Sequence, residues 1–126
     1  MELLKKTLIF GIIMLSIDIP WITYVMSGLY KNVFKITLNK SAAILAYLCM
    51  VLTYPFIISK FDKLDEQIKV AMVLGLVTFG TYGFTLAAIY NKYPLSTAFM
   101  EAIWGIILYT ITTILTHTII ELKFIF

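Results

Sequence analysis

Four apolar stretches, each about as long as a membrane-spanning helix, constrain the fold of this chain more than any other feature. They cover residues 7–26, 41–59, 68–90 and 97–120. About 20 mostly apolar residues in an α-helix cross the hydrocarbon core of a bilayer, and lipid offers the backbone no partner outside the helix. The sequence therefore predicts an all-α fold: an integral membrane four-helix bundle that forms a single transmembrane domain over residues 1–126.

Composition favours a membrane protein over a soluble domain. The chain is 61% hydrophobic and 13% charged, whereas a soluble domain is about half apolar and roughly a quarter charged. All ten basic residues are lysines, and they lie between the apolar stretches, where anionic lipid headgroups would meet them. Nucleic-acid binding would need them on one face. We therefore expect the lipid bilayer as a partner and no nucleic acid.

The first stretch has an alternative interpretation, a cleaved signal peptide. Two lysines precede the apolar run 8–17, as they do in signal sequences. Asp18 and Pro20 follow that run, however, and no cleavage motif of small residues occurs before Lys31. We therefore favour an uncleaved span.

The connections between the spans are polar. Residues 29–40 have the spacing of a short amphipathic segment in the membrane interface, and residues 60–69 form a charged, solvated loop. Residues 91–96 predict a tight turn, with Ser96 placed to cap the fourth helix.

Lysine asymmetry gives a weak indication of orientation. With both termini inside, the inner side holds more lysines than the outer side, so we expect both termini to be cytoplasmic. The inner set is Lys5, Lys6, Lys60, Lys63, Lys69 and Lys123, and the outer set is Lys31, Lys35, Lys40 and Lys92.

Acidic side chains inside two of the spans are the strongest indication of function, because an ionisable group costs about 2.5 to 3.5 kcal/mol at a helix centre. Asp18 and Trp21 are three residues apart in the first helix, as are Glu101 and Trp104 in the fourth. This acid-x-x-Trp spacing places each acid and its Trp on one helix face. The two helices cross the bilayer in opposite directions, so all four residues are candidates for one outward-facing cavity. Two carboxyl groups in an apolar site cannot both ionise cheaply, so the pair would bind a proton.

A structural interpretation stays open for each acid. Trp is common at membrane interfaces, and an acid near a helix start favours the helix dipole, which explains Glu101 well. Asp18 fits this interpretation poorly, since it lies about halfway along its helix. Pro20 removes the hydrogen bond to the carbonyl of Ser16 and kinks the helix. A freed carbonyl there could hold water or a cation, although membrane helices tolerate proline generally.

The third span carries a stripe of small and hydroxylated residues. Gly75, Thr78, Tyr82 and Thr85 follow helical spacing and share a face. Such residues let helices approach one another and form hydrogen bonds in lipid, and we favour that role. The alternative is that Thr78, Tyr82 and Thr85 line a substrate path.

Other chemistry has little support in the sequence. His117 lies about 160° around its helix from Glu101, so we expect it to reach the interface rather than to join the acids. One cysteine and one histidine cannot build a zinc site, and no nucleophile motif or phosphate-binding loop occurs. We expect no metal and no cofactor, and we leave enzymatic activity open as the less favoured class of function.

Four short motifs are spread along nearly the whole chain. In order they are Ile17-Asp18-Ile19-Pro20-Trp21, Gly80-Thr81-Tyr82, Tyr93-Pro94-Leu95 and Glu101-Ala102-Ile103-Trp104-Gly105. In these motifs the chain resembles the domain-of-unknown-function 2177 family, small membrane proteins found widely in bacteria. The resemblance implies a four-helix membrane protein and no established activity.

The chain departs from the family pattern at two places. The family's fourth helix usually begins with Asp where this chain has Glu101. Its third helix usually reads Thr-Tyr-Asp-Leu-Thr-Asn, where residues 81–86 read Thr-Tyr-Gly-Phe-Thr-Leu. The resemblance therefore implies that any site built from the third-helix acid and amide is altered in this chain.

Three functions remain as hypotheses. The one we favour is transport of a proton, a cation or a small solute through a cavity lined by the intramembrane acids. Four helices are few for a carrier, so a homo-oligomer is expected, and the ligand is unknown. The alternative is a structural or partner-binding membrane protein whose buried polar residues specify helix packing. An intramembrane enzyme that uses paired carboxyls as general acid and base is the least favoured.

Overall fold

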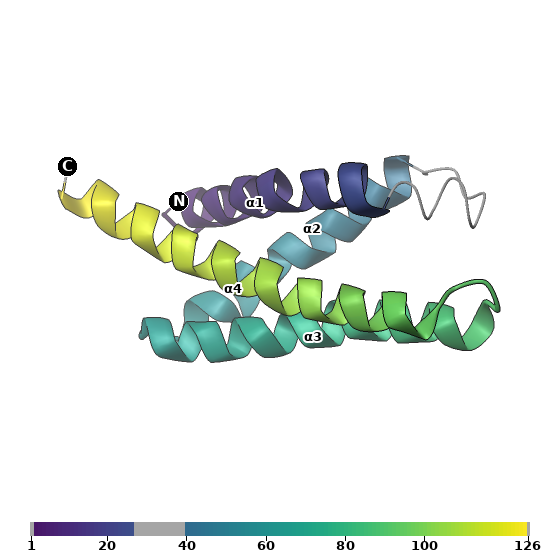
Figure 1. The fold of residues 1–126 in the computed structure, drawn as a ribbon. Helices are drawn as coiled ribbons and strands as arrows, with labels where there is room; N and C mark the ends of the chain where they lie inside the picture. Colours follow the sequence, from purple (N-terminus) through teal and green to yellow (C-terminus); the bar gives the residue numbers. More distant parts are fainter. Residues whose placement is uncertain (1, 27–39, 126) are drawn as a thin grey trace.

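The computed structural model of the chain describes residues 2–26 and 40–125 (Figure 1). Its elements are α1 (Glu2–Pro20), a π-helical segment η1 (Trp21–Met26), α2 (Lys40–Phe56), a short 3-10 helix η3 (Ile58–Lys60), α3 (Leu64–Ile89) and α4 (Leu95–Ile125). Four helices are long and apolar enough to cross a membrane, and no strand occurs in the described residues. The expectation of an all-α membrane bundle is confirmed. The interfacial segment expected over 29–40 lies, apart from Lys40, outside the described residues.

The third helix begins before its apolar stretch does. α3 starts at Leu64, whereas we expected a start at residue 68, and its first turn contains Asp65 and Glu66. Acidic side chains in the first turn of a helix are stabilised by the positive end of the helix dipole. The charged end of the expected loop therefore belongs to the helix.

The fourth helix begins directly after a proline. The backbone N–H groups of Thr97 and Ala98 donate to the carbonyl of Pro94 at 3.1 and 3.2 Å. Ser96, which we expected to cap this helix, lies inside its first turn, because α4 starts at Leu95.

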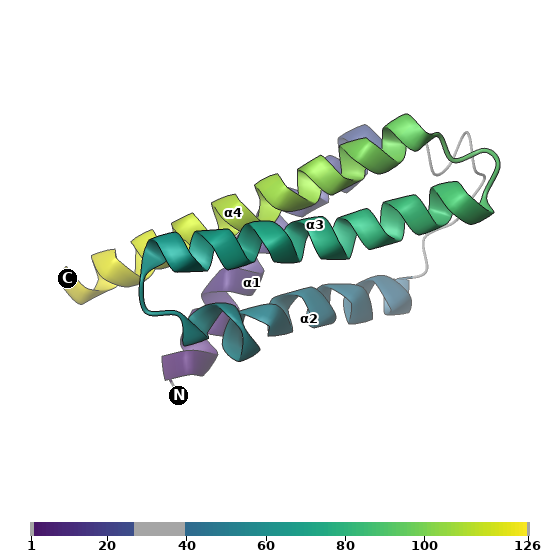
Figure 2. The same ribbon diagram turned by 90° about the horizontal axis from the view of Figure 1, so that it is seen from below.

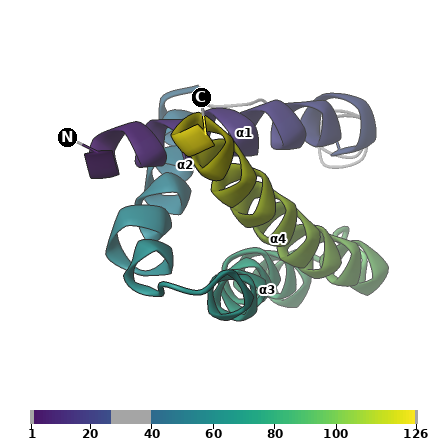
Figure 3. The same cartoon turned by 90° about the vertical axis from the view of Figure 1, so that its left-hand side faces the viewer.

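The helices form two pairs that are packed together mainly through α1 and α4. α2 packs against α1, and α3 packs along α4, while contact between α1 and α4 joins the pairs, as the end-on view in Figure 3 shows. The start of α1 and the end of α4 lie at the same end of the bundle (Figures 1 and 2). This arrangement follows from an even number of spans joined by short connections.

Glycines let α3 and α4 approach backbone to backbone. A Cβ atom built on Gly75 would lie 2.5 Å from the carbonyl carbon of Gly105, and one on Gly105 would lie 2.6 Å from Cβ of Phe79. Near the other end of the pair, a Cβ on Gly83 would lie 3.2 Å from the Cα of Ala98. Small residues are the usual means of close helix packing in lipid.

The core lies where α1, α2 and α4 meet. Phe10 and Met14 of α1 are fully buried there, as is Tyr109 of α4. The Phe10 ring stacks on the ring of Tyr54 from α2, with the centroids 5.0 Å apart. The Tyr109 hydroxyl donates to the carbonyl of Met50 at 3.3 Å. Apolar contacts and this polar bridge hold α2 against the rest of the bundle.

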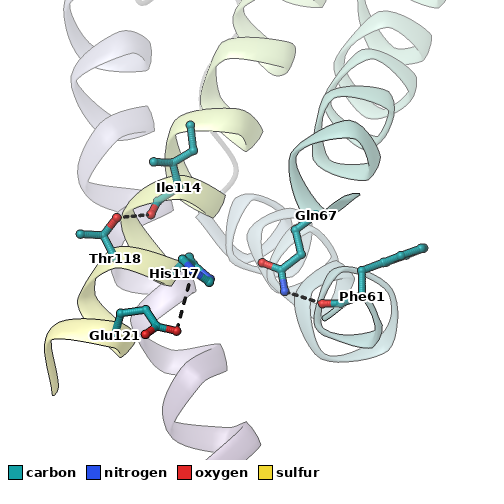
Figure 4. Close-up of polar contacts among 6 residues, drawn as sticks. All are labelled: Phe61, Gln67, Ile114, His117, Thr118 and Glu121. Atoms are coloured by element: carbon teal, nitrogen blue, oxygen red, sulfur yellow. Dashed lines mark hydrogen bonds and ion pairs between the residues drawn. The ribbon is translucent and has the colours of Figure 1, made fainter. Parts of the chain in front are cut away.

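The ends of α3 and α4 carry exposed polar contacts (Figure 4). The side-chain amide of Gln67 donates to the carbonyl of Phe61 at 2.7 Å, which closes the turn before α3. His117 Nε2 lies 3.9 Å from the Glu121 carboxyl, and the Glu121 side chain is 66% exposed. His117 is thus at the end of α4, far along the helix from Glu101.

We expect the His117–Glu121 contact to contribute little to stability. Exposed pairs with this spacing on a helix contribute about 0.3 to 0.5 kcal/mol. Glu121→Gln should therefore change the free energy of unfolding by less than about 0.5 kcal/mol, measured by reversible unfolding of the purified protein in mixed micelles. A loss several times larger would show that Glu121 has a structural role that these contacts do not explain.

Candidate functional site

Asp18 lies near the end of α1, where a proline disturbs the helical hydrogen bonds. Pro20 has no N–H group, so the carbonyl of Ser16 loses its usual partner. Beyond Pro20 the chain continues as the π-helical segment Trp21–Met26. Such segments are rare and occur often at functional sites.

The Asp18 carboxyl group joins three helices. It is 2% exposed. The hydroxyl of Tyr47, from α2, donates to Oδ2 at 2.5 Å, and the indole N–H of Trp104, from α4, donates to Oδ1 at 2.8 Å. Each carboxyl oxygen therefore has a neutral donor from a different neighbouring helix.

Two indoles and a second acid complete the cluster. The rings of Trp21 and Trp104 stack with centroids 4.4 Å apart and planes 6° from parallel. Glu101, one turn before Trp104, is 4% exposed. The indole N–H of Trp21 faces the Glu101 carboxyl without reaching the geometry of a hydrogen bond. Among the described residues, Glu101 thus has no donor comparable with the two that hold Asp18.

No lysine neutralises this pair in the part of the chain that the structure describes. Glu101 interacts electrostatically with Asp18 and with the Tyr47 hydroxyl. The ion pair found within residues 2–26 and 40–125 is His117–Glu121, at the other end of α4. Buried charges in proteins are normally paired. The cluster can therefore accept positive charge, as a proton or as a cation.

The α3 candidates lie elsewhere. The Thr78 hydroxyl donates to the carbonyl of its own helix at Leu74, 2.7 Å away. Tyr82 is 50% exposed, and Thr85 is exposed as well. The structure therefore brings together Asp18, Trp21, Glu101 and Trp104, and it leaves Thr78, Tyr82 and Thr85 outside this group.

The α3 residue that does reach the cluster is a glycine. A Cβ atom on Gly83 would lie 3.4 Å from the Cβ of Glu101. This is the position at which the family pattern has an acid. In this chain the backbone of α3 packs against Glu101 instead.

Sequence reasoning missed Tyr47. The signal was weak, because Tyr47 is one hydroxyl in an otherwise apolar span and aromatic residues are common in such spans. The available indication was the position of Tyr47 along its span, which is close to the depth of Asp18 in the bilayer. Tyr47 lies seven residues after Lys40, and Asp18 lies eight residues before Met26, so both sit at a similar distance from the ends that the connection 27–39 joins.

The comparisons with known proteins give a family without an activity. No curated protein and no solved structure matches the chain. A family model described as "Predicted membrane protein (DUF2177)" matches residues 3–118. This span includes most of each of the four helices and every residue of the cluster, so the chain belongs to the DUF2177 family of membrane proteins.

Proposed function

We propose that this multi-pass membrane protein binds a proton, a cation or a small solute at the Asp18–Glu101 pair and transports it across the bilayer. One observation carries the proposal: two acids from antiparallel helices are 2% and 4% exposed and lie together, with no cationic side chain beside them among the described residues. Intramembrane acids that face a bundle interior are typical of ion and solute pathways.

The two acids have different roles in this proposal. Asp18 accepts hydrogen bonds from Tyr47 and Trp104, so moving it would leave two buried donors without an acceptor. Glu101 has no comparable donors in the described residues and has greater freedom to change its partner. Asp18 is therefore the fixed acid, and Glu101 is the group that exchanges its ligand.

A second copy of the chain would complete the transporter. Four helices offer few surfaces for a carrier that opens alternately to both sides. The exposed face of α3 carries the hydroxyl groups of Tyr82 and Thr85 beside the apolar Ile89, and hydroxylated residues on a lipid-facing helix favour helix association. We place the contact between two copies on this face.

Glu101→Gln should strongly slow transport while leaving the fold intact, because it removes the exchangeable charge and keeps the size of the side chain. Purified protein is placed in lipid vesicles that contain a trapped pH-sensitive dye and are subjected to a pH gradient. A second set of vesicles contains a potassium-sensitive dye and is subjected to a potassium gradient. We expect the wild type to dissipate at least one gradient faster than protein-free vesicles. Glu101→Gln should slow this by about tenfold or more, which corresponds to 1.4 kcal/mol.

Glu121→Gln is the matched control for this experiment. It makes the same acid-to-amide change on the same helix, at an exposed position at the far end, and should leave the flux unchanged. Wild-type flux no faster than that of empty vesicles would rule out transport of these ions. Flux that persists in Glu101→Gln would remove Glu101 from the path.

A second candidate function rests on the hydrogen bonds of Asp18. The chain Tyr47–Asp18–Trp104 connects α2 to α4 through α1, and such a network can serve to specify helix packing alone. A Glu101→Gln variant of normal stability, together with absent flux in the wild type, would favour this structural role.

A further inference from the structure

We propose that the solute bound at this site is an organic monocation with apolar substituents, such as a quaternary ammonium or phosphonium ion. This inference rests on the proposed function and names its solute. It is drawn from three features of the cluster: an acid without a strong donor, a stacked pair of indoles, and the scarcity of oxygen ligands.

The first feature is the charge. The Glu101 carboxyl is buried to 4% exposure beside Asp18, without a well-formed hydrogen bond from the described residues. A neutral solute would leave both acids without a counter-charge in an apolar setting, which is unfavourable. A solute with one positive charge neutralises the exchangeable acid and leaves Asp18 in its own hydrogen bonds.

The second feature is the aromatic surface around the acids. Trp21 and Trp104 stack on one another, and Tyr47 lies at the Asp18 carboxyl. Both indoles are only half-buried, so part of each side chain lies at the surface of the bundle. Organic cations bind to such faces within about 6 Å of a ring centroid, and Trp is the best partner.

The third feature argues against a metal ion. Calcium takes six to eight oxygen ligands and magnesium requires an octahedral set. No group of three or more His, Cys, Asp or Glu side chains able to hold a metal occurs among residues 2–26 and 40–125. The groups near Glu101 include the two stacked indoles and the Tyr47 phenol, and aromatic rings suit a large, weakly hydrated cation.

The chain offers a direct probe of this site, because its two tryptophans are both in the cluster. Tryptophan emission, excited selectively, is followed while tetraphenylphosphonium is added to the protein in a neutral maltoside detergent. We expect a saturable change in emission. Glu101→Gln should weaken the apparent affinity by about tenfold or more, and Glu121→Gln should leave it unchanged.

A neutral probe of similar shape keeps the test valid even if Glu101→Gln folds poorly. Triphenylphosphine oxide should produce no saturable change in the wild type. The inference is overturned if tetraphenylphosphonium gives no saturable response, if the neutral probe binds equally well, or if a folded Glu101→Gln protein binds tetraphenylphosphonium like the wild type.

Two further measurements complete the test. The first identifies the source of the cation, and the second distinguishes a failure of this inference from a failure of the proposed function. If phosphatidylcholine added to the micelles competes with the probe and phosphatidylethanolamine does not, the quaternary ammonium chemistry stands and its source is a lipid headgroup. Saturable binding of tetraphenylphosphonium, without flux of tetraethylammonium into vesicles above that of protein-free vesicles, would support the site and defeat transport. Proton flux that depends on Glu101, without binding of tetraphenylphosphonium, would support transport and defeat the organic cation.

Discussion

Gly75→Ala is expected to lower the free energy of unfolding by about 2 to 3 kcal/mol, although alanine is the better helix former. The added Cβ would lie 2.5 Å from the carbonyl carbon of Gly105 and 2.9 Å from the backbone nitrogen of Ile106. No side chain can rotate away from this clash, because the atoms it meets belong to the backbone of α4. The two helices must move apart, and the contacts along their whole length loosen. Unfolding by sodium dodecyl sulfate in mixed micelles, followed by circular dichroism, measures the loss.

Gly80→Ala is the matched control, because it adds the same methyl group to the same helix. A Cβ on Gly80 would lie 3.7 Å from the nearest atoms, those of Ala102 and Leu76, which is an ordinary contact. Alanine favours a helix over glycine by about 1 kcal/mol, so this variant should be as stable as the wild type or slightly more stable. Equal stability of Gly75→Ala and Gly80→Ala would show that α3 and α4 are not packed as closely as described.

The membrane bundle could be predicted from the sequence because lipid leaves the chain few choices. An apolar run of sufficient length must be helical, since the backbone finds no other hydrogen-bond partner in a bilayer. Helix ends were harder to predict, because they depend on local interactions outside the apolar core. α3 extends back to Asp65 and Glu66 in what we expected to be a solvated loop.

The acids and their indoles could be placed together because their spacing is short and rigid. In each acid-x-x-Trp motif, three residues fix the relation of acid and indole on one helix face. The antiparallel order of the first and fourth spans then brings Asp18 and Glu101 to the same depth. Neither step depends on how the helices cross.

The role of the α3 stripe could not be predicted in this way. Its prediction as a packing surface assumed that one face of the helix contacts the neighbouring helices along its whole length. At 100° per residue, Gly80 and Gly83 lie about 140° and 80° around the helix from Gly75, yet all three lie at the contact with α4. The contact with α4 therefore spans about 140° of the α3 surface, more than a single stripe. Thr85 lies about 160° from Gly83 and is exposed as a result. The crossing angle of two helices depends on how their side chains pack together, so it cannot be predicted from the sequence of one helix.

Asp18→Leu is expected to lower the free energy of unfolding by about 2 to 4 kcal/mol, because it leaves the Tyr47 hydroxyl and the Trp104 indole N–H without their acceptor. Leucine itself is well suited to an apolar bundle, so the cost arises from the two abandoned donors rather than from the new side chain. The Trp104 emission should also change, since its N–H loses a partner. Unfolding in mixed micelles measures the first effect, and the emission spectrum of the native protein measures the second.

A double-mutant cycle shows whether the cost belongs to the hydrogen bonds. Tyr47→Phe should cost about 0.6 to 1.7 kcal/mol in the wild type, the range found for polar contacts between membrane helices, and almost nothing once Asp18 is leucine. Asp18→Asn is the conservative control, because its amide oxygen can accept from Trp104 while its NH₂ group donates to the Tyr47 oxygen, so most of the stability should remain. Additive effects of Asp18→Leu and Tyr47→Phe would mean that these side chains do not act together. The network that holds α2 against α4 would then have to lie in Tyr109 and Met50 instead.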